Sequence, residues 1–157
     1  MRILGIDPGI GRCGWGVVEK KTGAFIPIAY GCIETDSKQL IEKRLLALHE
    51  EIMQILKEYQ PDAFAIEELF FNTNAKTAFA VGQARGVVLL CGAEHNLETA
   101  VYTPLQVKMA LTGYGRAEKS QIGQMVKILL KLEKIPKPDD TADALAIALT
   151  HAFNLHN

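Results

Sequence analysis

The stretch GIDPGIGRCGWG, residues 5–16, decides how this chain begins to fold. Gly9, Gly11 and Gly14 form G-x-G-x-x-G, the glycine pattern of a dinucleotide-binding loop. Such a loop has to open a helix, so that the pyrophosphate meets the helix N-terminus. Here the glycines lead into the extended-looking run WGVV, so nucleotide binding of that type is disfavoured. The stretch instead predicts a turn after a buried strand that ends on Asp7, with glycines that leave room for a ligand backbone or a phosphate.

Hydrophobic periodicity predicts a mixed α/β order of elements along the rest of the chain. Predicted strands span residues 2–7, 15–19, 24–35, 63–67 and 97–102. Apolar residues spaced 4, 3, 4, 3 and 4 predict a helix over 41–59, capped by Asp36 or Ser37. Residues 70–77 have the composition of a loop. Further helices are predicted over 78–94, from Pro104 to a break at 112–115, over 118–132 and over 139–153.

Composition bounds the class of protein. The length of 157 residues predicts one domain over residues 1–157. We expect a cytoplasmic protein, because no apolar run approaches the roughly 20 residues that a membrane span needs. The net charge of −1 conceals a contrast, since residues 34–68 hold nine acidic and four basic side chains, whereas 106–137 hold seven basic and two acidic ones. Cysteine and histidine spacings predict neither a disulfide nor a zinc site; the cysteines are expected to be small buried hydrophobes.

Carboxylates stand at the ends of three predicted elements. Asp7 and Glu67 each end an apolar strand, and Asp140 and Asp143 lie three residues apart, on one face of the last helix. Two divalent ions about 3.5–4 Å apart need such an oxygen-rich cluster. Taken singly, Asp140 and Asp143 could cap the start of the helix and interact favourably with its dipole, and Glu67 could lie exposed to solvent at the end of its strand. The three segments together favour a metal site.

The chain resembles the RuvC family of Holliday junction resolvases, which have the RNase H-like fold. Four segments carry the resemblance, in the order of the family and over nearly the whole chain: GIDPGIGRCGWGV at 5–17, PDAFAIEELFFNTNAKTAFAVGQARGV at 61–87, QVKMALTGYGRAEKSQI at 106–122 and DDTADALAIALTHA at 139–152. The resemblance implies an α/β protein with a mixed five-stranded sheet and helices on both faces.

The resemblance also implies a homodimeric, Mg²⁺-dependent endonuclease that makes paired symmetric nicks in four-way DNA junctions, in homologous recombination and DNA repair. It implies two Mg²⁺ ions per site, for which Mn²⁺ would substitute, and a branch-migration motor as a partner. The implied metal ligands and catalytic residues are Asp7, Glu67, Asp140 and Asp143, with Lys119 as a catalytic lysine. The resemblance further implies that water attacks the phosphate in line, that Asp7 bridges the ions and that Lys119 stabilises the developing charge.

DNA contacts are predicted on both sides of the carboxylates. The resemblance places Lys108 and Lys119 near the scissile phosphate, and their basic segment suits phosphate contact. It matches Phe70 to an aromatic that stacks on a base, although Phe71 is an alternative. Further phosphate contacts are predicted at Arg12, Asn72, Asn74 and Lys76.

The predicted helix over 78–94 is apolar nearly all round, so it is either buried or meets a partner. The resemblance favours dimerisation through it. Two other function classes stay open: another RNase H-like nuclease that acts on RNA–DNA hybrids or RNA ends, and a non-catalytic junction-binding protein.

Overall fold

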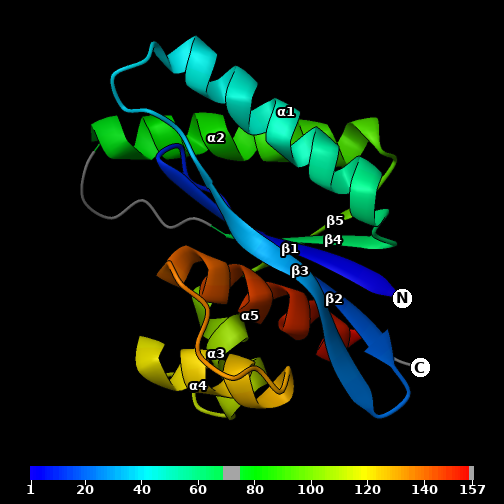
Figure 1. Ribbon diagram of the computed structural model, residues 1–157. Coiled ribbons are helices and arrows are strands. Elements are labelled where there is room, and N and C mark those ends of the chain that lie inside the picture. Colours follow the sequence, from blue (N-terminus) through cyan, green and yellow to red (C-terminus); the bar gives the residue numbers. More distant parts are fainter. Residues whose placement is uncertain (69–74, 156–157) are drawn as a thin grey trace.

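A computed structural model describes residues 1–68 and 75–155 of the chain, with side chains omitted at 75 and 76. Figure 1 shows a central sheet between two layers of helices. The strands are β1 (Arg2–Asp7), β2 (Arg12–Lys21), β3 (Ala24–Glu34), β4 (Ala63–Glu67) and β5 (Thr99–Tyr102). The helices are α1 (Ile41–Tyr59), α2 (Ala75–Glu94), α3 (Pro104–Thr112), α4 (Lys119–Leu129) and α5 (Asp139–Asn154). None of the helices in the described part of the chain is long and apolar enough to cross a membrane.

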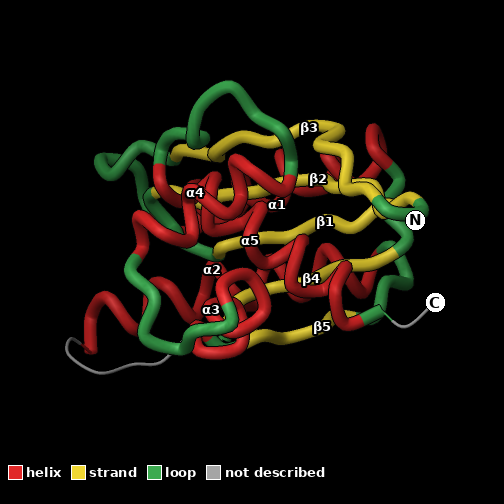
Figure 2. The backbone as a smooth tube through the Cα atoms, turned by 90° about the horizontal axis from the view of Figure 1, so that it is seen from below, coloured by secondary structure: helices red, strands yellow, loops and turns green. Residues whose placement is uncertain are grey.

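The five strands form one mixed sheet in the order β3-β2-β1-β4-β5 (Figure 2). β1, β2 and β3 pair antiparallel as a meander, whereas β1, β4 and β5 run parallel. The parallel register places Ile6 beside Ile66, so β1 and β4 end side by side. The predicted mixed five-stranded sheet is therefore present, and its parallel half brings the carboxyl ends of two central strands to one edge.

The two faces of the sheet carry separate hydrophobic cores. Leu4, Ile6 and Phe64 are fully buried on the face that α1 and α2 cover. Ile3 and Ala65 are fully buried on the other face, against α5 with α3 and α4 behind it. Since side chains alternate along a strand, Asp7 and Glu67 share the second face with Ile3 and Ala65. The helices on both faces agree with the expected architecture.

Glycines in β1 and β2 let α5 lie directly on the sheet. A Cβ atom at Gly5 would lie 2.3 Å from the carbonyl oxygen of Ala144, and one at Gly14 would lie 1.9 Å from that of Asp140. The expectation that the glycines after Asp7 leave room for a ligand is therefore wrong at Gly14, because the backbone of the chain itself fills that space. Gly9 likewise faces the carbonyl of Arg12. The glycines bring the first turn of α5 to the strand ends.

Several predicted boundaries differ from the structure. β2 begins at Arg12 rather than at residue 15, because its ladder with β3 runs through the glycines from the Arg12–Glu34 pair. β5 begins two residues later than predicted, and α4 ends at Leu129, before the left-handed backbone of Lys131. The helix predicted over 78–94 already begins at Ala75, so residues 75–77 are not a loop.

The expected caps of α1 are also wrong. Leu40 precedes the helix and no side chain caps it. Asp36 instead accepts a hydrogen bond at Oδ1 from the backbone N–H of Lys38, as short polar residues do in turns. The missing cap is compensated by burial, because Leu48 and Ile52 of α1 are fully buried against the sheet.

Candidate functional site

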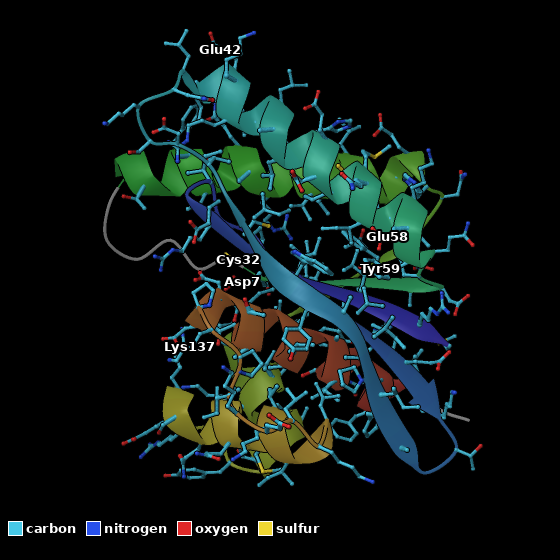
Figure 3. All side chains as sticks on the ribbon, in the orientation of Figure 1. Asp7, Cys32, Glu42, Glu58, Tyr59 and Lys137 are labelled. Atoms are coloured by element: carbon cyan, nitrogen blue, oxygen red, sulfur yellow. The ribbon has the colours of Figure 1, made fainter. Side chains whose placement is uncertain are left out.

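The candidate site lies at the edge where β1 and β4 end, under the first turns of α5. β1 ends at Asp7, β4 ends at Glu67, and α5 contributes Asp140 and Asp143 from its first two turns. Figure 3 shows Asp7 where the sheet meets the start of α5. The structure therefore brings carboxylates from three segments into one neighbourhood, where their charges interact.

Electrostatics show how closely these carboxylates interact. Burial, followed by the charges of Glu67, Asp143 and Asp140, raises the pKa of Asp7 to about 7. Burial and the charge of Asp143 raise the pKa of Glu67, and burial also raises that of Asp143. A raised carboxyl pKa means that the site disfavours its own negative charge. Positive charge placed among these groups would stabilise their ionised forms.

Lys119, the first residue of α4, supplies one such positive charge. Its Nζ lies 2.7 Å from Oδ2 of Asp143. Partial burial lowers the pKa of Lys119, but the hydrogen bond to Asp143 and the charge of that carboxylate outweigh it, so the net pKa is raised. The helix start is held by Gln121, whose Oε1 accepts a hydrogen bond from the backbone N–H of Glu118. Lys119 is thus a fixed cation beside the carboxylates.

A pocket of about 270 Å³ opens beside this ion pair. Its polar lining combines Glu67 and Asp143 with Lys108 and Lys119. Lys108 comes from α3, which begins with a capping box: Thr103 Oγ1 accepts from the backbone N–H of Gln106, while Gln106 Oε1 accepts from that of Thr103. The pocket therefore joins two of the predicted acidic residues to both lysines predicted near a scissile phosphate.

The apolar wall of this pocket was not foreseen in the sequence. It consists of Pro104, Val107, Ile122 and Ala146. The signal was present in the spacing along the two lysine-bearing helices. Pro104 lies four residues before Lys108 and Ile122 lies three residues after Lys119, so each shares a helix face with its lysine. Only the packing of α3 and α4 against α5 turns these neighbours into one wall.

The donor set suits a hard divalent cation. Carboxylate oxygens are the ligands that Mg²⁺ and Ca²⁺ prefer, and the raised pKa of Asp7 marks a place where cationic charge would be stabilising. Among the described residues, no three of these four carboxylates bring their oxygens within 4.8 Å of one another. This wide spacing agrees with repulsion among like charges. Asp7, Glu67, Asp140 and Asp143 are therefore the residues that could hold such an ion.

The other predicted contacts lie farther out or outside the described residues. Arg12 begins β2, where its Nε lies 3.6 Å from a Glu34 oxygen, and it is not part of the pocket lining. Lys76 lies in the first turn of α2, but its side chain is not described. The predictions for Phe70, Phe71, Asn72 and Asn74 fall outside the described residues.

The raised pKa of Asp7 predicts a pH-dependent stability of the chelator-treated protein. The folded-state pKa of about 7 exceeds the ordinary value of 3.8, so the native state binds the proton more tightly than the unfolded chain. Stability from this group is complete below pH 3.8 and is lost as pH rises through 7. We expect the free energy of unfolding of wild type to fall by about 2 kcal/mol relative to Asp7→Asn between pH 5 and 8.

Urea unfolding in EDTA at several pH values measures this difference. Subtracting the Asp7→Asn curve removes the contributions of groups that titrate in both proteins, among them His151, whose pKa burial lowers. Glu68→Gln, at an exposed residue next to Glu67, is the matched control and should keep the wild-type slope. Equal slopes for wild type and Asp7→Asn would contradict the prediction.

Comparisons with known proteins identify relatives of this chain. The family model of the crossover junction endodeoxyribonuclease RuvC matches residues 3–151. A RuvC endodeoxyribonuclease of Desulforamulus reducens is 57% identical over 152 residues, which cover 97% of this chain and 93% of that protein.

Two solved structures of Thermus thermophilus RuvC share 39% sequence identity with the chain. One superposes with a TM-score of 0.89, over 98% of this chain and 94% of that one. The other, a complex with a Holliday junction substrate, superposes with a TM-score of 0.93, over 98% and 93%. The expected α/β architecture of the RNase H-like fold is confirmed. With the family model spanning nearly all of the chain and a relative sharing more than half of its residues, this protein belongs to the RuvC family.

Proposed function

We propose that this chain is a structure-selective endonuclease that resolves four-way DNA junctions by paired symmetric nicks, in recombination and repair. The observation that carries the proposal is the neighbourhood of Glu67, Asp143, Lys108 and Lys119 in one pocket, beside the half-buried carboxylate of Asp7, in a member of the RuvC family. Carboxylates for metal and lysines for phosphate are the groups that phosphodiester hydrolysis requires. The solved relative bound to a Holliday junction supports the choice of substrate.

Asp7, Glu67, Asp140 and Asp143 would hold two Mg²⁺ ions in the proposed site, for which Mn²⁺ would substitute. When bound, such ions activate the attacking water and stabilise the leaving oxygen. Asp7 would be the central ligand of such ions, because its carboxylate interacts electrostatically with all three others. Glu67 and Asp143 flank it and also reach the pocket.

The lysines act on the phosphate. Lys119 carries its charge next to Asp143 and remains protonated, because its pKa is raised. It is therefore suited to stabilise the negative charge that develops on the phosphate oxygens. Lys108 lines the same pocket from α3 and is suited to fix the position of the phosphate. Arg12, Lys76, Asn72 and Phe70 remain proposed contacts to the junction arms and bases.

The experiment for this function uses a synthetic four-way junction that is labelled on each arm in turn. We expect paired nicks in opposite strands in Mg²⁺ and none in EDTA. The same assay with an RNA–DNA hybrid separates the alternatives: cleavage of the hybrid but not of the junction would identify another RNase H-like nuclease. Junction binding with no product in Mg²⁺ or Mn²⁺ would identify a non-catalytic binding protein.

We also infer that the chain forms a homodimer through α2. The exposed positions Phe79, Gly82, Gly86, Leu90 and Ala93 follow one another at spacings of 3, 4, 4 and 3. They form one uncharged outer stripe, in which Phe79 and Leu90 are 71% and 53% exposed. The opposite side of α2 packs on the sheet through Ala84 and Val88. A two-fold dimer would present two equivalent sites to a nearly two-fold junction.

Placing a charge on this stripe should dissociate the dimer. We expect Phe79→Glu to weaken self-association by at least about 30-fold, because the loss of an interface aromatic that carries much of the binding energy costs about 2 kcal/mol or more. Sedimentation velocity over a range of concentrations measures the change. Leu46→Glu, at a 49% exposed residue of α1, is the matched control and should leave the dimer intact. A Phe79→Glu protein that sediments as wild type does would contradict dimerisation through α2.

We propose one nuclease domain over residues 1–157, acting in the cytoplasm with a branch-migration motor. The basic segment that contains α4 and the two pocket lysines offers a surface for DNA, whereas the uncharged α2 stripe lies in the helical layer on the other face of the sheet. The proposed DNA and dimer surfaces are thus carried by different helices.

A further inference from the structure

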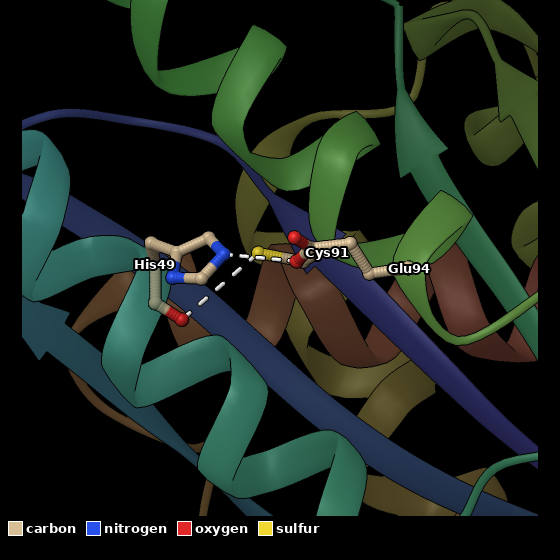
Figure 4. Close-up of side chains that lie close together, drawn as sticks. All are labelled: His49, Cys91 and Glu94. Atoms are coloured by element: carbon tan, nitrogen blue, oxygen red, sulfur yellow. Dashed lines mark hydrogen bonds and ion pairs between the residues drawn. The ribbon is translucent and has the colours of Figure 1, made fainter.

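A second group of ligand atoms lies in the layer of α1 and α2. His49 comes from α1, and Cys91 and Glu94 come from α2. Nε2 of His49 lies 2.9 Å from Oε2 of Glu94, and the Sγ of Cys91 donates a weak hydrogen bond of 3.9 Å to the backbone oxygen of His49. The imidazole nitrogen, the thiol sulfur and a carboxylate oxygen all lie within 4.8 Å of one another (Figure 4).

The two helices hold this group by ordinary helix geometry. Cys91 and Glu94 are three residues apart, so they project from the same face of α2. α1 packs against α2 and brings His49 over that face, from a residue 42 positions earlier in the chain. Cys91 is completely buried, while the side chains of His49 and Glu94 are 30% and 41% exposed. The group thus forms a shallow site with its sulfur at the bottom and its oxygen and nitrogen at the rim.

We propose that His49, Cys91 and Glu94 form a zinc-binding site that links α1 to α2. A thiolate, an imidazole and a carboxylate are ligands that Zn²⁺ accepts together, at about 2.3, 2.0 and 2.0–2.2 Å. Tetrahedral bonds of those lengths separate the ligand atoms by roughly 3.3–3.7 Å. The observed separations, from 2.9 Å to less than 4.8 Å, bracket that range, so small side-chain shifts would close the site.

Charge and proton balance also favour a divalent ion. Thiolate and carboxylate together contribute two negative charges, so one Zn²⁺ makes the site neutral. On binding, the S–H bond of Cys91 breaks, its proton passes to the buffer, and the sulfur bonds to the metal. His49 binds through Nε2 in its Nδ1–H tautomer. Water from the exposed rim fills the fourth position, as in sites with three protein ligands.

This site is independent of the proposed nuclease site. α1 and α2 cover one face of the sheet, whereas α5 and its aspartates lie on the other (Figure 1). The ligand types differ as well, because the nuclease site offers carboxylate oxygens, which suit Mg²⁺ and Mn²⁺, and the helix site offers sulfur and nitrogen. The expected role is structural: the ion would fasten the C-terminal end of α2 to α1 and so fix the orientation of the uncharged α2 stripe.

The competing interpretation is an ordinary His49–Glu94 ion pair above a buried thiol. Burial, reinforced by the charge of Glu94, raises the pKa of Cys91 to about 11, so without metal it is a thiol. The cysteine spacing in the sequence favours this inert role. The two interpretations differ in one observable, which is a direct bond between Cys91 sulfur and an added metal.

Cobalt(II), a spectroscopic stand-in for Zn²⁺, detects that bond. The full chain is treated with EDTA, exchanged into buffer with a reductant that does not bind metal, and titrated with Co²⁺. We expect a sulfur-to-cobalt charge-transfer band in the near ultraviolet and the visible bands of tetrahedral cobalt, both removed by competing Zn²⁺. Cys91→Ser should lose the charge-transfer band, while Cys32→Ser, at a half-buried cysteine of β3, should keep it.

Two further variants test the same site if Cys91→Ser folds poorly. His49→Gln and Glu94→Gln change partly exposed side chains and should each weaken Co²⁺ binding by at least about tenfold. Glu50→Gln, at the exposed residue beside His49, is the matched control and should bind as wild type does. Zn²⁺ at about 100 times its dissociation constant for this site should raise the Tm of an Asp7→Asn protein by at least about 5 °C. The same Zn²⁺ concentration should raise the Tm of Asp7→Asn/Glu94→Gln by no more than about half as much, because its binding is at least tenfold weaker. A cobalt spectrum without a sulfur band, or one that Cys91→Ser leaves unchanged, would overturn the zinc site.

Discussion

Replacing Asp7 with asparagine is expected to lower cleavage of a four-way junction by at least about 10³-fold, which corresponds to about 4 kcal/mol of lost transition-state stabilisation. Asp7 is the half-buried carboxylate that interacts with Glu67, Asp140 and Asp143 together, so it lies at the centre of the proposed metal site. The amide has nearly the same shape but no charge. It therefore removes the central anionic ligand and leaves the fold in place.

Single-turnover cleavage of a labelled junction, with a parallel measurement of junction binding, tests this expectation. Binding should remain within about threefold of wild type, because phosphate contacts supply most of the affinity of a nucleic-acid complex. Asp139→Asn is the matched control: Asp139 is an exposed aspartate directly before Asp140, and its carboxylate pairs with Lys137. It should cleave within about twofold of wild type. If Asp7→Asn cleaves the junction within tenfold of the wild-type rate, Asp7 is not a catalytic residue.

Gly14→Ala should destabilise the protein by at least about 3 kcal/mol, at the upper end of the cost of overpacking. The added Cβ would lie 1.9 Å from the carbonyl oxygen of Asp140 and 2.3 Å from its carbonyl carbon. Both are backbone atoms of the first turn of α5, so no side-chain rotation relieves the clash. The helix has to move away from β2, and Asp140 and Asp143 move with it.

Urea unfolding measures the loss of stability. The Mg²⁺ concentration that the folded fraction needs for cleavage measures how far Asp140 and Asp143 have moved with the first turn of α5. Gly11→Ala is the matched control in the same glycine-rich stretch, because its Cβ would approach only a terminal nitrogen of Arg44, at 3.8 Å. It should change the free energy of unfolding by no more than about 0.5 kcal/mol. Equal stability of the two variants would show that α5 does not depend on the glycine at position 14.

The order of strands and helices was predictable from the sequence because it depends on local periodicity. The 4-3-4-3-4 spacing of apolar residues predicts the helix α1, and the apolar runs predict the strands β1 and β4; each pattern lies within the element that it predicts. Boundaries were less predictable wherever a neighbouring element decides them. The antiparallel ladder extends β2 back to Arg12 through glycines that alone predict a turn, and sheet packing rather than a capping side chain sets the start of α1.

The candidate site shows the same division between local and tertiary information. Asp7 and Glu67 were identified because each ends an apolar strand, and the two aspartates of α5 because they lie one turn apart. The ion pair between Lys119 and Asp143 had no signal in the sequence, since 24 positions separate the two residues and the distance of 2.7 Å exists only after α4 packs on α5. The proposed zinc ligands had no signal in the sequence for the same reason, because His49 lies 42 positions before Cys91.

By itself the sequence determined the chemistry that the protein carries: four acidic residues at element ends, a basic segment with Lys108 and Lys119, and a helix without a polar face. The tertiary structure alone decided which of these groups meet. Carboxylates repel one another, so they come together only because burial of the two sheet faces, with α5 seated on Gly5 and Gly14, outweighs that repulsion. That balance involves contacts between distant segments, and local patterns in a single sequence do not record it.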